Sequence, residues 1–276
     1  MPRPTVFIAA LLLLCGNASG ADHPCAIPPS PGELTRIGDL IYRNECNRQP
    51  QCLVDWNPGE DFPSLGIGHF IWYPEGVEPR FTESFPLLVQ HLNQQRVTLP
   101  RWLDQLNPLT APWPDRATFL QQRDSKPVLA LQAFLARHTD AQTAFLLQRL
   151  QQALPDLMQQ VPSAERPGLQ RKLTQLCDSW LGWYSLIDYV NFKGEGLNPS
   201  EAYAGKGWGL KQVLIRMNGG NAHSAHERFA DAAAAVAHDR AAPPKDVPRP
   251  RARVRPGPLE GRAGPVEIRD RAVQPD

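Results

Sequence analysis

The chain lacks an excess of charge of either sign. Its 276 residues include 29 Lys and Arg and 28 Asp and Glu, which gives a formal net charge of +1 at pH 7. Proteins that bind nucleic acids through bulk charge carry a strongly basic surface, and acidic tails carry long runs of carboxylates. The near-balance of charge therefore argues against a nucleic acid as partner.

The chain also lacks an apolar run of the roughly 20 residues that a membrane-spanning helix needs. The N-terminal run 6–15 is too short for this, follows Arg3 and precedes small residues up to Gly20, which is typical of a secretory signal peptide. We expect residues 1–20 to be removed on export and the protein to be periplasmic or secreted. Lipid attachment at Cys15 is disfavoured, because a leucine rather than a small residue precedes it.

Motifs of common cofactor and metal sites are absent. The sequence has no Walker loop, no zinc-ligand spacing and no Ser-His-Asp signature that stands out. A single histidine such as His69 is more often held by hydrogen bonds than bound to a metal. We therefore expect neither a metal ion nor a cofactor.

Four cysteines remain once residues 1–20 are removed, namely Cys25, Cys46, Cys52 and Cys177. An even number suits disulfides in an oxidising compartment, and three pairings are possible. Proximity favours Cys46 with Cys52, but six residues of continuous helix would separate their Cα atoms by about 9 Å, beyond the roughly 7 Å limit of a disulfide. If that pair forms, the preceding helix must end at Cys46, and Cys25 with Cys177 would join the mature N-terminus to a late helix.

A helix is predicted to begin at Ser30. Ser30, Pro31 and Glu33 supply an N-cap, a proline at the first helical position and the acidic residue of a capping box. Its apolar residues recur at helical spacing, at Leu34, Ile37, Leu40 and Ile41. One further turn places Glu45 on this apolar stripe, so we expect a carboxyl group facing the core at the end of the helix.

The segment 64–73, SLGIGHFIWY, alternates with the period of a β-strand. Leu65, Ile67 and His69 fall on one face, and Gly66 and Gly68 fall on the other. Two glycines on one face leave a shallow surface that backbone or ligand can approach.

The remainder is predicted to be helical up to about residue 218, with a Leu- and Gln-rich region at 76–176 that looks like a helical insertion. Residues 221–276 form an Ala-, Arg- and Pro-rich tail, and from residue 241 onward the composition cannot bury enough apolar area to offset the entropy lost on ordering. We expect this tail to be disordered.

Three segments resemble the phage-type lysozymes. Glu45 at a helix end, followed by SLGIGHF at 64–70, is similar to the helix-terminal Glu and TIGxGH hairpin of that family; LIDYVNFKGEG at 186–196 and GWGLKQVLIRMNGG at 207–220 resemble its later helices. The resemblance covers about 34–75 and 183–220. It implies a mostly helical α+β, lysozyme-like fold for residues 21–220, with a small β-hairpin. It also implies cleavage of the β-1,4 bond between N-acetylmuramic acid and N-acetylglucosamine in peptidoglycan glycan strands.

The resemblance assigns Glu45 as general acid. A glycosidase acid must hold a proton near neutrality, and burial raises the pKa of a carboxyl group. The family carries a second acid six residues before the hairpin threonine, where this chain has Pro58. Asp55, Glu60 and Asp61 are nearby substitutes, and Asp61 is our prediction because it lies closest to the hairpin. Ser64 occupies the threonine position and could either orient a water molecule or close a turn.

Other residues are predicted to contact the glycan. They are His69, Trp72, Tyr73, Glu195 and Tyr203, although aromatic residues of this kind are also common in cores. Two alternatives remain open. A lytic transglycosylase would use the same Glu alone and form an anhydro sugar, and a non-catalytic glycan-binding cell-wall protein would keep the fold without turnover.

Overall fold

The computed structural model describes residues 24–197, 207–218 and 223–241. Helices are α1 (Pro31–Cys46), α2 (Phe85–Gln94), α3 (Arg101–Asp104), α4 (Arg116–Gln121), α5 (Lys126–Arg137), α6 (Thr139–Gln159), α7 (Arg166–Cys177), α8 (Trp180–Lys193), α9 (Leu210–Arg216) and α10 (Ala225–Ala241), with a 3-10 turn η1 (Pro50–Leu53). Strands β1 (Val54–Asp55), β2 (Ser64–Leu65) and β3 (Phe70–Ile71) form one antiparallel sheet. The fold is therefore mostly helical α+β, as predicted. No helix in these ranges is both long and apolar enough to cross a membrane.

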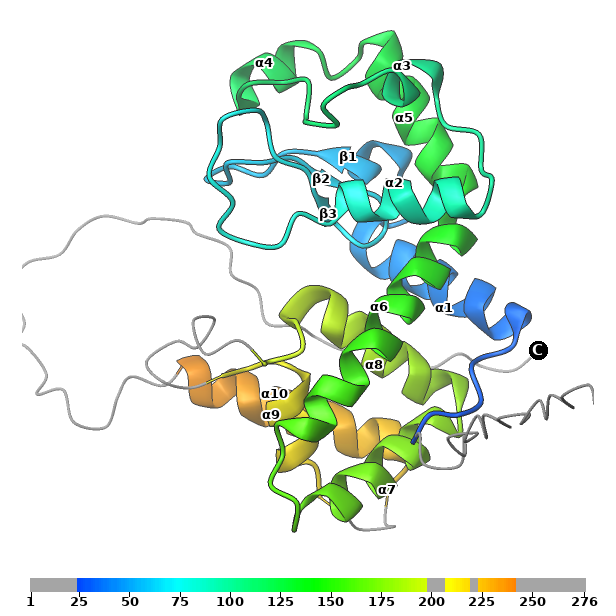
Figure 1. The fold of residues 1–276 in the computed structure, drawn as a ribbon, viewed down its shortest axis with the longest axis vertical. Helices are drawn as coiled ribbons and strands as arrows, with labels where there is room; N and C mark the ends of the chain where they lie inside the picture. The colour runs from blue at the N-terminus through cyan, green and yellow to red at the C-terminus, as the bar shows by residue number, and fades with distance from the viewer. Residues whose placement is uncertain (1–23, 198–206, 219–222, 242–276) are drawn as a thin grey trace, which may run out of the picture.

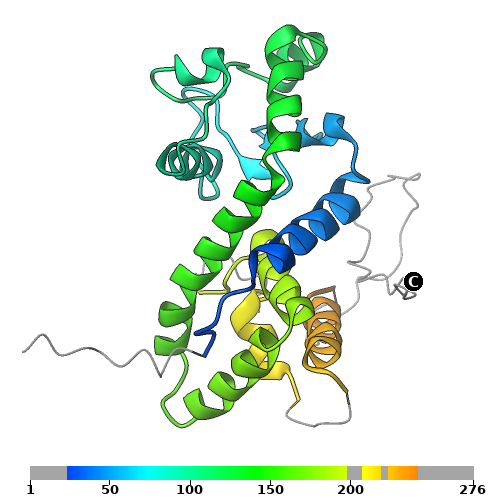
Figure 2. The same cartoon turned by 90° about the vertical axis from the view of Figure 1, so that its right-hand side faces the viewer.

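Two groups of elements are joined by α6 (Figures 1 and 2). The sheet and α2 to α5 lie at one end, α7 to α10 lie at the other, and the long α6 runs from the first group into the second. Helix α1 packs across α6 and also contacts α8. Gly38 of α1 permits this close approach, because a Cβ atom there would collide with the Thr143 hydroxyl oxygen of α6. The C-terminal end of α1 therefore lies where both groups meet.

Helix α1 begins and ends as the sequence predicts. The Ser30 hydroxyl accepts a hydrogen bond from the Glu33 amide, and the Glu33 carboxylate accepts one from the Ser30 amide at 2.8 Å. At the other end, Asn47 and Arg48 adopt left-handed conformations with φ of 47° and 55°, which stops the helix. The predicted Cys46–Cys52 disulfide forms, and Cys25 is bonded to Cys177, the pairing that the sequence left conditional; each has a Cα–Cα distance of 5.4 Å.

The segment 64–73 is a hairpin and not one continuous strand. Its two strands, β2 and β3, contain two residues each and are joined by a tight turn in which Gly66 and His69 have φ of 68° and 48°. The left-handed Gly66 breaks the simple alternation of faces. Beyond the turn, the Trp72 ring lies 4.7 Å from that of Phe85 and 6.0 Å from that of Trp113, in the core beneath the sheet.

The region 76–176 is helical as predicted, but its last part is central to the fold. Helix α6 packs against α1, α2 and α8, and α7 packs against α8, α9 and α10. These helices bury continuous apolar faces, including Leu146, Leu150, Leu169 and Leu173. Helices α6 and α7 therefore contribute to the main core.

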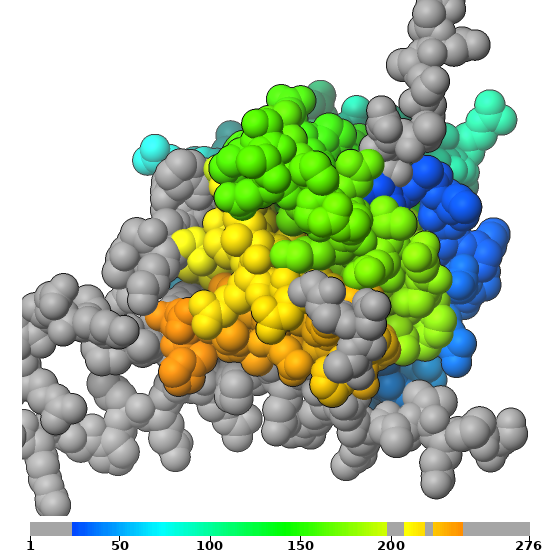
Figure 3. All heavy atoms as spheres, turned by 90° about the horizontal axis from the view of Figure 1, so that it is seen from below, coloured from blue at the N-terminus to red at the C-terminus, as the bar shows by residue number. Residues whose placement is uncertain are grey.

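The tail predicted for residues 221–276 overlaps an ordered helix at its N-terminal end. Residues of α10 at 225–241 form a helix that buries Phe229, Ala232, Ala233 and Val236 against α7, α8 and α9. Figure 3 shows α10 (orange) directly beside α9 (yellow). Small alanines allow this close packing, so a composition poor in large apolar residues still gives an ordered helix. Residues 1–20, which are predicted to be a signal peptide, Tyr203 and the residues beyond 241 lie outside the described residues.

Candidate active site at the end of helix α1

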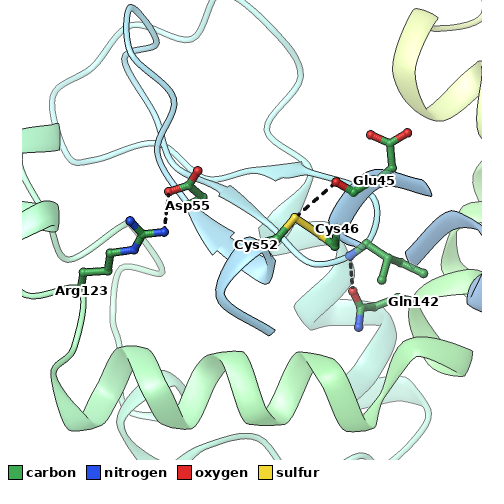
Figure 4. Close-up of a disulfide and its surroundings, with 7 residues drawn as sticks. Glu45, Cys46, Cys52, Asp55, Arg123 and Gln142 are labelled. Atoms are coloured by element: carbon green, nitrogen blue, oxygen red, sulfur yellow. Dashed lines mark hydrogen bonds and ion pairs between the residues drawn. A yellow bond between two sulfur atoms is a disulfide. The ribbon is translucent and has the colours of Figure 1, made fainter. Parts of the chain in front are cut away.

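Glu45 is placed by the disulfide that follows it. Cys46, the last residue of α1, is bonded to Cys52 of η1, and the Cys52 Sγ lies 3.7 Å from the Glu45 carbonyl oxygen (Figure 4). The disulfide therefore ties the last turn of α1 to the start of the sheet. The backbone of Glu45 is therefore held by the helix before it and by the disulfide after it, and its side chain is exposed.

The prediction that Glu45 faces the core is wrong. Glu45 is exposed, and Cys46 occupies the buried position with 5% of its surface accessible. The apolar stripe drifts around a helix of 3.6 residues per turn, so it passes from Ile37 and Ile41 to Tyr42 and Cys46. The protein around the Glu45 carboxyl nevertheless raises its pKa by desolvation, and the positive charge of Lys193 partly opposes this.

Helix α8 brings a second carboxyl group to Glu45. Asp188 of α8 is half-buried, and its Oδ1 atom is fully buried with no hydrogen-bond partner within the described part of the chain. Burial, and then the charge of Glu45, raise the pKa of Asp188 to about 7, while a hydrogen bond from Tyr184 lowers it. The Tyr184 hydroxyl in turn accepts a hydrogen bond from Asn44 of α1 at 3.0 Å. This network attaches the last turn of α1 to α8.

His69 faces the disulfide from the hairpin turn. Its ring nitrogens and the sulfurs of Cys46 and Cys52 include one atom from each residue that all lie within 4.8 Å of one another. Its ring also packs edge-on against Phe192 of α8, with centroids 5.6 Å apart. Burial lowers the pKa of His69, and the charge of Asp55 opposes this. The two sulfurs are bonded to each other, so they do not offer the thiolates that a zinc site needs.

Gln142 holds the hairpin turn in place and was missed by the sequence analysis. Its side chain is fully buried; Oε1 accepts a hydrogen bond from the Ile67 amide at 2.9 Å, and Nε2 donates to the carbonyls of Leu135 and His138 at 2.7 and 3.1 Å (Figure 4). A glutamine in a Gln-rich helix gives no sequence signal that separates it from its exposed neighbours.

The candidate second acids lie in different surroundings. Asp61, our prediction, is exposed, and its carboxylate has no ion-pair or hydrogen-bond partner in the described ranges. Glu60 is half-buried and accepts a hydrogen bond from Asn57 at 3.1 Å; burial raises its pKa, and the charge of Asp55 adds to this rise. Asp55 ends β1 and lies 3.8 Å from the Arg123 guanidinium (Figure 4). Ser64 begins β2 and is 7% exposed.

Two of the predicted glycan-contacting residues are in the core. Trp72 is fully buried and donates its indole N–H to the Leu109 carbonyl at 3.2 Å. Tyr73 is 4% exposed, and its hydroxyl accepts hydrogen bonds from the amides of Arg80 and Phe81. Both are therefore structural here, because the hairpin turns at 66–69 and sends the following residues inward. Glu195 is half-buried. Burial lowers the pKa of Arg149 on α6, and the negative charge of Glu195 partly opposes this.

Two surface hollows lie away from Glu45. One, of about 360 Å³, is lined by Asp156, Gln159, Gln160 and Leu197. The other, of about 310 Å³, is lined by residues between 161 and 172 together with Ile215. Neither is lined by Glu45, which lies on an exposed surface.

Comparisons with known proteins add no assignment. No protein-family model, curated protein or solved structure matches the chain.

Proposed function

We propose that the protein cleaves the β-1,4 bond between N-acetylmuramic acid and N-acetylglucosamine in peptidoglycan, with Glu45 as general acid. One observation carries this proposal. The Glu45 carboxyl is open to solvent, yet the protein around it raises its pKa. Such a group can both retain a proton and reach the oxygen of a glycosidic bond.

The surroundings of Glu45 suit proton donation. Asp188 lies behind it with a pKa of about 7, so the pair readily holds a proton in mildly acidic solution. Lys193 stabilises the Glu45 carboxylate that remains after the proton is given to the leaving oxygen. The Cys46–Cys52 disulfide and the Asn44 hydrogen bond hold the turn that carries Glu45.

The two disulfides support an oxidising compartment. Together with the signal-like residues 1–20, they support a periplasmic or secreted location. Peptidoglycan strands are accessible to a protein exported in this way.

The test is digestion of purified peptidoglycan by the mature protein and by Glu45→Gln, with mass spectrometry of the released fragments. Glu78→Gln is the matched control, because Glu78 is an exposed loop residue. We expect fragments with reducing ends from the unmodified protein and the control, and none from Glu45→Gln. Fragments lighter by one water would instead indicate a lytic transglycosylase. Absence of release by the folded unmodified protein would contradict both and favour glycan binding without cleavage.

A further inference from the structure

The two glycines of the hairpin turn leave room for two amide side chains, one from each neighbouring helix. A Cβ atom at Gly66 would collide with Gln142 Oε1 of α6, and a Cβ atom at Gly68 would lie 3.1 Å from the Oδ1 atom of Asn191 on α8. Gln142 uses this closeness to accept a hydrogen bond from the Ile67 amide (Figure 4). Asn191 contacts the same turn but makes no direct hydrogen bond within the described part of the chain.

Four polar atoms are buried without a partner where α8 meets this turn. Both polar atoms of the Asn191 amide, Asp188 Oδ1 and His69 Nε2 have no hydrogen-bond partner among the residues that the structure describes. Asp188 and Asn191 are three residues apart on α8, so their side chains are neighbours on one face of the helix. His69 belongs to the turn, and the centroid of its ring lies 5.6 Å from that of Phe192, the residue after Asn191. The four atoms therefore belong to one contact between α8 and the turn.

These atoms continue a polar stripe along α8. Tyr184, Asp188 and Asn191 recur at intervals of four and three residues, which places them on one face of the helix. Tyr184, the first of the three, is bonded directly to Asn44 of α1. The other two keep unpaired buried atoms. Direct contact with α1 therefore satisfies only the first part of the stripe.

The chemistry of the unpaired atoms suits water. Buried polar groups without a protein partner are normally bonded to ordered water molecules, each of which makes about three hydrogen bonds. The Asn191 amide offers a donor and an acceptor, Asp188 Oδ1 offers an acceptor, and His69 Nε2 is either according to its tautomer. A water molecule donates two hydrogen bonds and accepts two, so about one or two molecules satisfy all four atoms. An apolar ligand would leave every one of them unpaired.

We infer that ordered water occupies the contact between α8 and the hairpin turn, and that Asn191 positions the Asp188 carboxyl group through this water. The Asn191 Nδ2 group donates a hydrogen bond to the water, and the water donates one to Asp188 Oδ1. The Tyr184 hydroxyl donates a further hydrogen bond to the same carboxyl group. Because Asp188 interacts by charge with Glu45, the water holds the less exposed member of this pair of acids.

The hairpin turn is then held from both sides by amide side chains, but in two different ways. Gln142 of α6 bonds the Ile67 amide directly, and Asn191 of α8 reaches the turn through water. Bridging water is nearly as favourable in enthalpy as a direct hydrogen bond, so the second link also restrains the turn. The same water joins His69 of the turn to Asp188 of α8.

The water itself is tested by NMR of the mature, ¹⁵N-labelled protein. The side-chain amide protons of Asn191 should show nuclear Overhauser effects to water, with the negative sign of a molecule that tumbles with the protein. Asn93 is the matched control, because it is exposed on α2 and meets only short-lived water. Absence of such an effect at Asn191 would overturn the inference.

The positioning role is tested by the pKa of Asp188 in two variants of Asn191. Asn191→Leu replaces the amide with an apolar group of similar size, so the water loses its donor and the Asp188 carboxylate is less well stabilised. The pKa of Asp188 should therefore rise above its value in the unmodified protein. Asn191→Ser keeps a hydroxyl and leaves room for a further water molecule, so the pKa should stay close to that value. Carboxyl ¹³C NMR measures both, and Asn93→Leu should cause no change.

Two results would contradict the positioning role. One is an unchanged pKa of Asp188 in folded Asn191→Leu, and the other is an equal rise in Asn191→Ser, which would point to altered packing. If Asn191→Leu does not fold, the Overhauser effect and the pKa in Asn191→Ser still decide. Neither readout uses peptidoglycan cleavage, so an inactive protein would overturn the proposed function and leave this inference in place.

Discussion

The charge of Glu45 on α1 raises the pKa of Asp188 on α8, in addition to the larger effect of burial, to about 7. Two neighbouring carboxyl groups resist ionising together, so one proton remains on the pair after the other has left. This relationship can be tested whatever reaction the protein performs.

Glu45→Gln is expected to lower the pKa of Asp188. The substitution removes the negative charge but leaves the burial, so the pKa should fall below about 7 and stay above that of an ordinary aspartate. Carboxyl ¹³C NMR of Asp188 across a pH titration measures this directly. Glu78→Gln should leave the midpoint where it is, and an unchanged midpoint in Glu45→Gln would mean that the two groups do not interact.

Asp188→Asn is expected to stabilise the protein at high pH. The pKa of Asp188 is about 7 in the folded protein, while an unfolded aspartate titrates near 4. The folded state therefore holds the extra proton, and stability falls as pH rises from about 4 to 7. Asparagine cannot ionise, so the variant should unfold at similar urea concentrations at pH 4 and be more stable at pH 8, by up to about 4 kcal/mol. Equal pH dependence in both proteins would refute this.

Lys193→Met is expected to raise the pKa of Glu45, because the positive charge that lowers it is lost. A general acid works in its protonated form, so the alkaline limb of kcat/KM should move to higher pH. The pH profile of peptidoglycan cleavage checks this. Lys126→Met, at an exposed position on α5, should leave the limb in place. A downward shift would be inconsistent with the role given to Lys193.

Gln142→Leu is expected to destabilise the fold by about 2 to 4 kcal/mol, because the Ile67 amide and the Leu135 carbonyl lose their partner in a buried place. Urea denaturation measures the loss. Gln152→Leu, on the exposed face of α6, should change stability by only about 0.5 kcal/mol. Similar values for the two variants would show that the contact with the hairpin turn contributes little.

Gly38→Ala and Gly32→Ala are expected to act in opposite directions, although both lie in α1. A Cβ atom at Gly38 would collide with the Thr143 side chain, which is fully buried, so the variant should lose about 1 to 3 kcal/mol. Nothing lies within 4 Å of a Cβ atom at Gly32, so alanine should add about 0.5 kcal/mol through its helix propensity. Thermal unfolding of both variants separates the two effects.

Local signals predicted the helix that carries Glu45. Ser30 and Glu33 satisfy each other's backbone amides, and this depends only on residues three apart. The geometry of a Cys46–Cys52 disulfide also required the helix to end at Cys46, as it does. Short-range hydrogen bonds and covalent geometry were therefore enough for the placement of Glu45 along the chain.

The neighbours of Glu45 depend on contacts that no local pattern contains. Asp55 faces Ser64 because of the pairing register of β1 and β2, which the long loop between them leaves open in the sequence. Trp72 is buried because the chain reverses at Gly66, where a regular alternation was expected. Gln142 reaches the turn through a hydrogen bond from the Ile67 amide, which lies 75 residues away in the sequence.

The Cys25–Cys177 disulfide makes a closed covalent ring of the first part of the described protein. Its ends lie 152 residues apart, and α1 to α7, the sheet, Glu45 and Asp55 all lie within the ring. A protease that cuts any loop inside it opens the ring without releasing a fragment. The protein can therefore be cut once within the ring and keep Glu45 on one covalently connected molecule, as long as this disulfide stays oxidised.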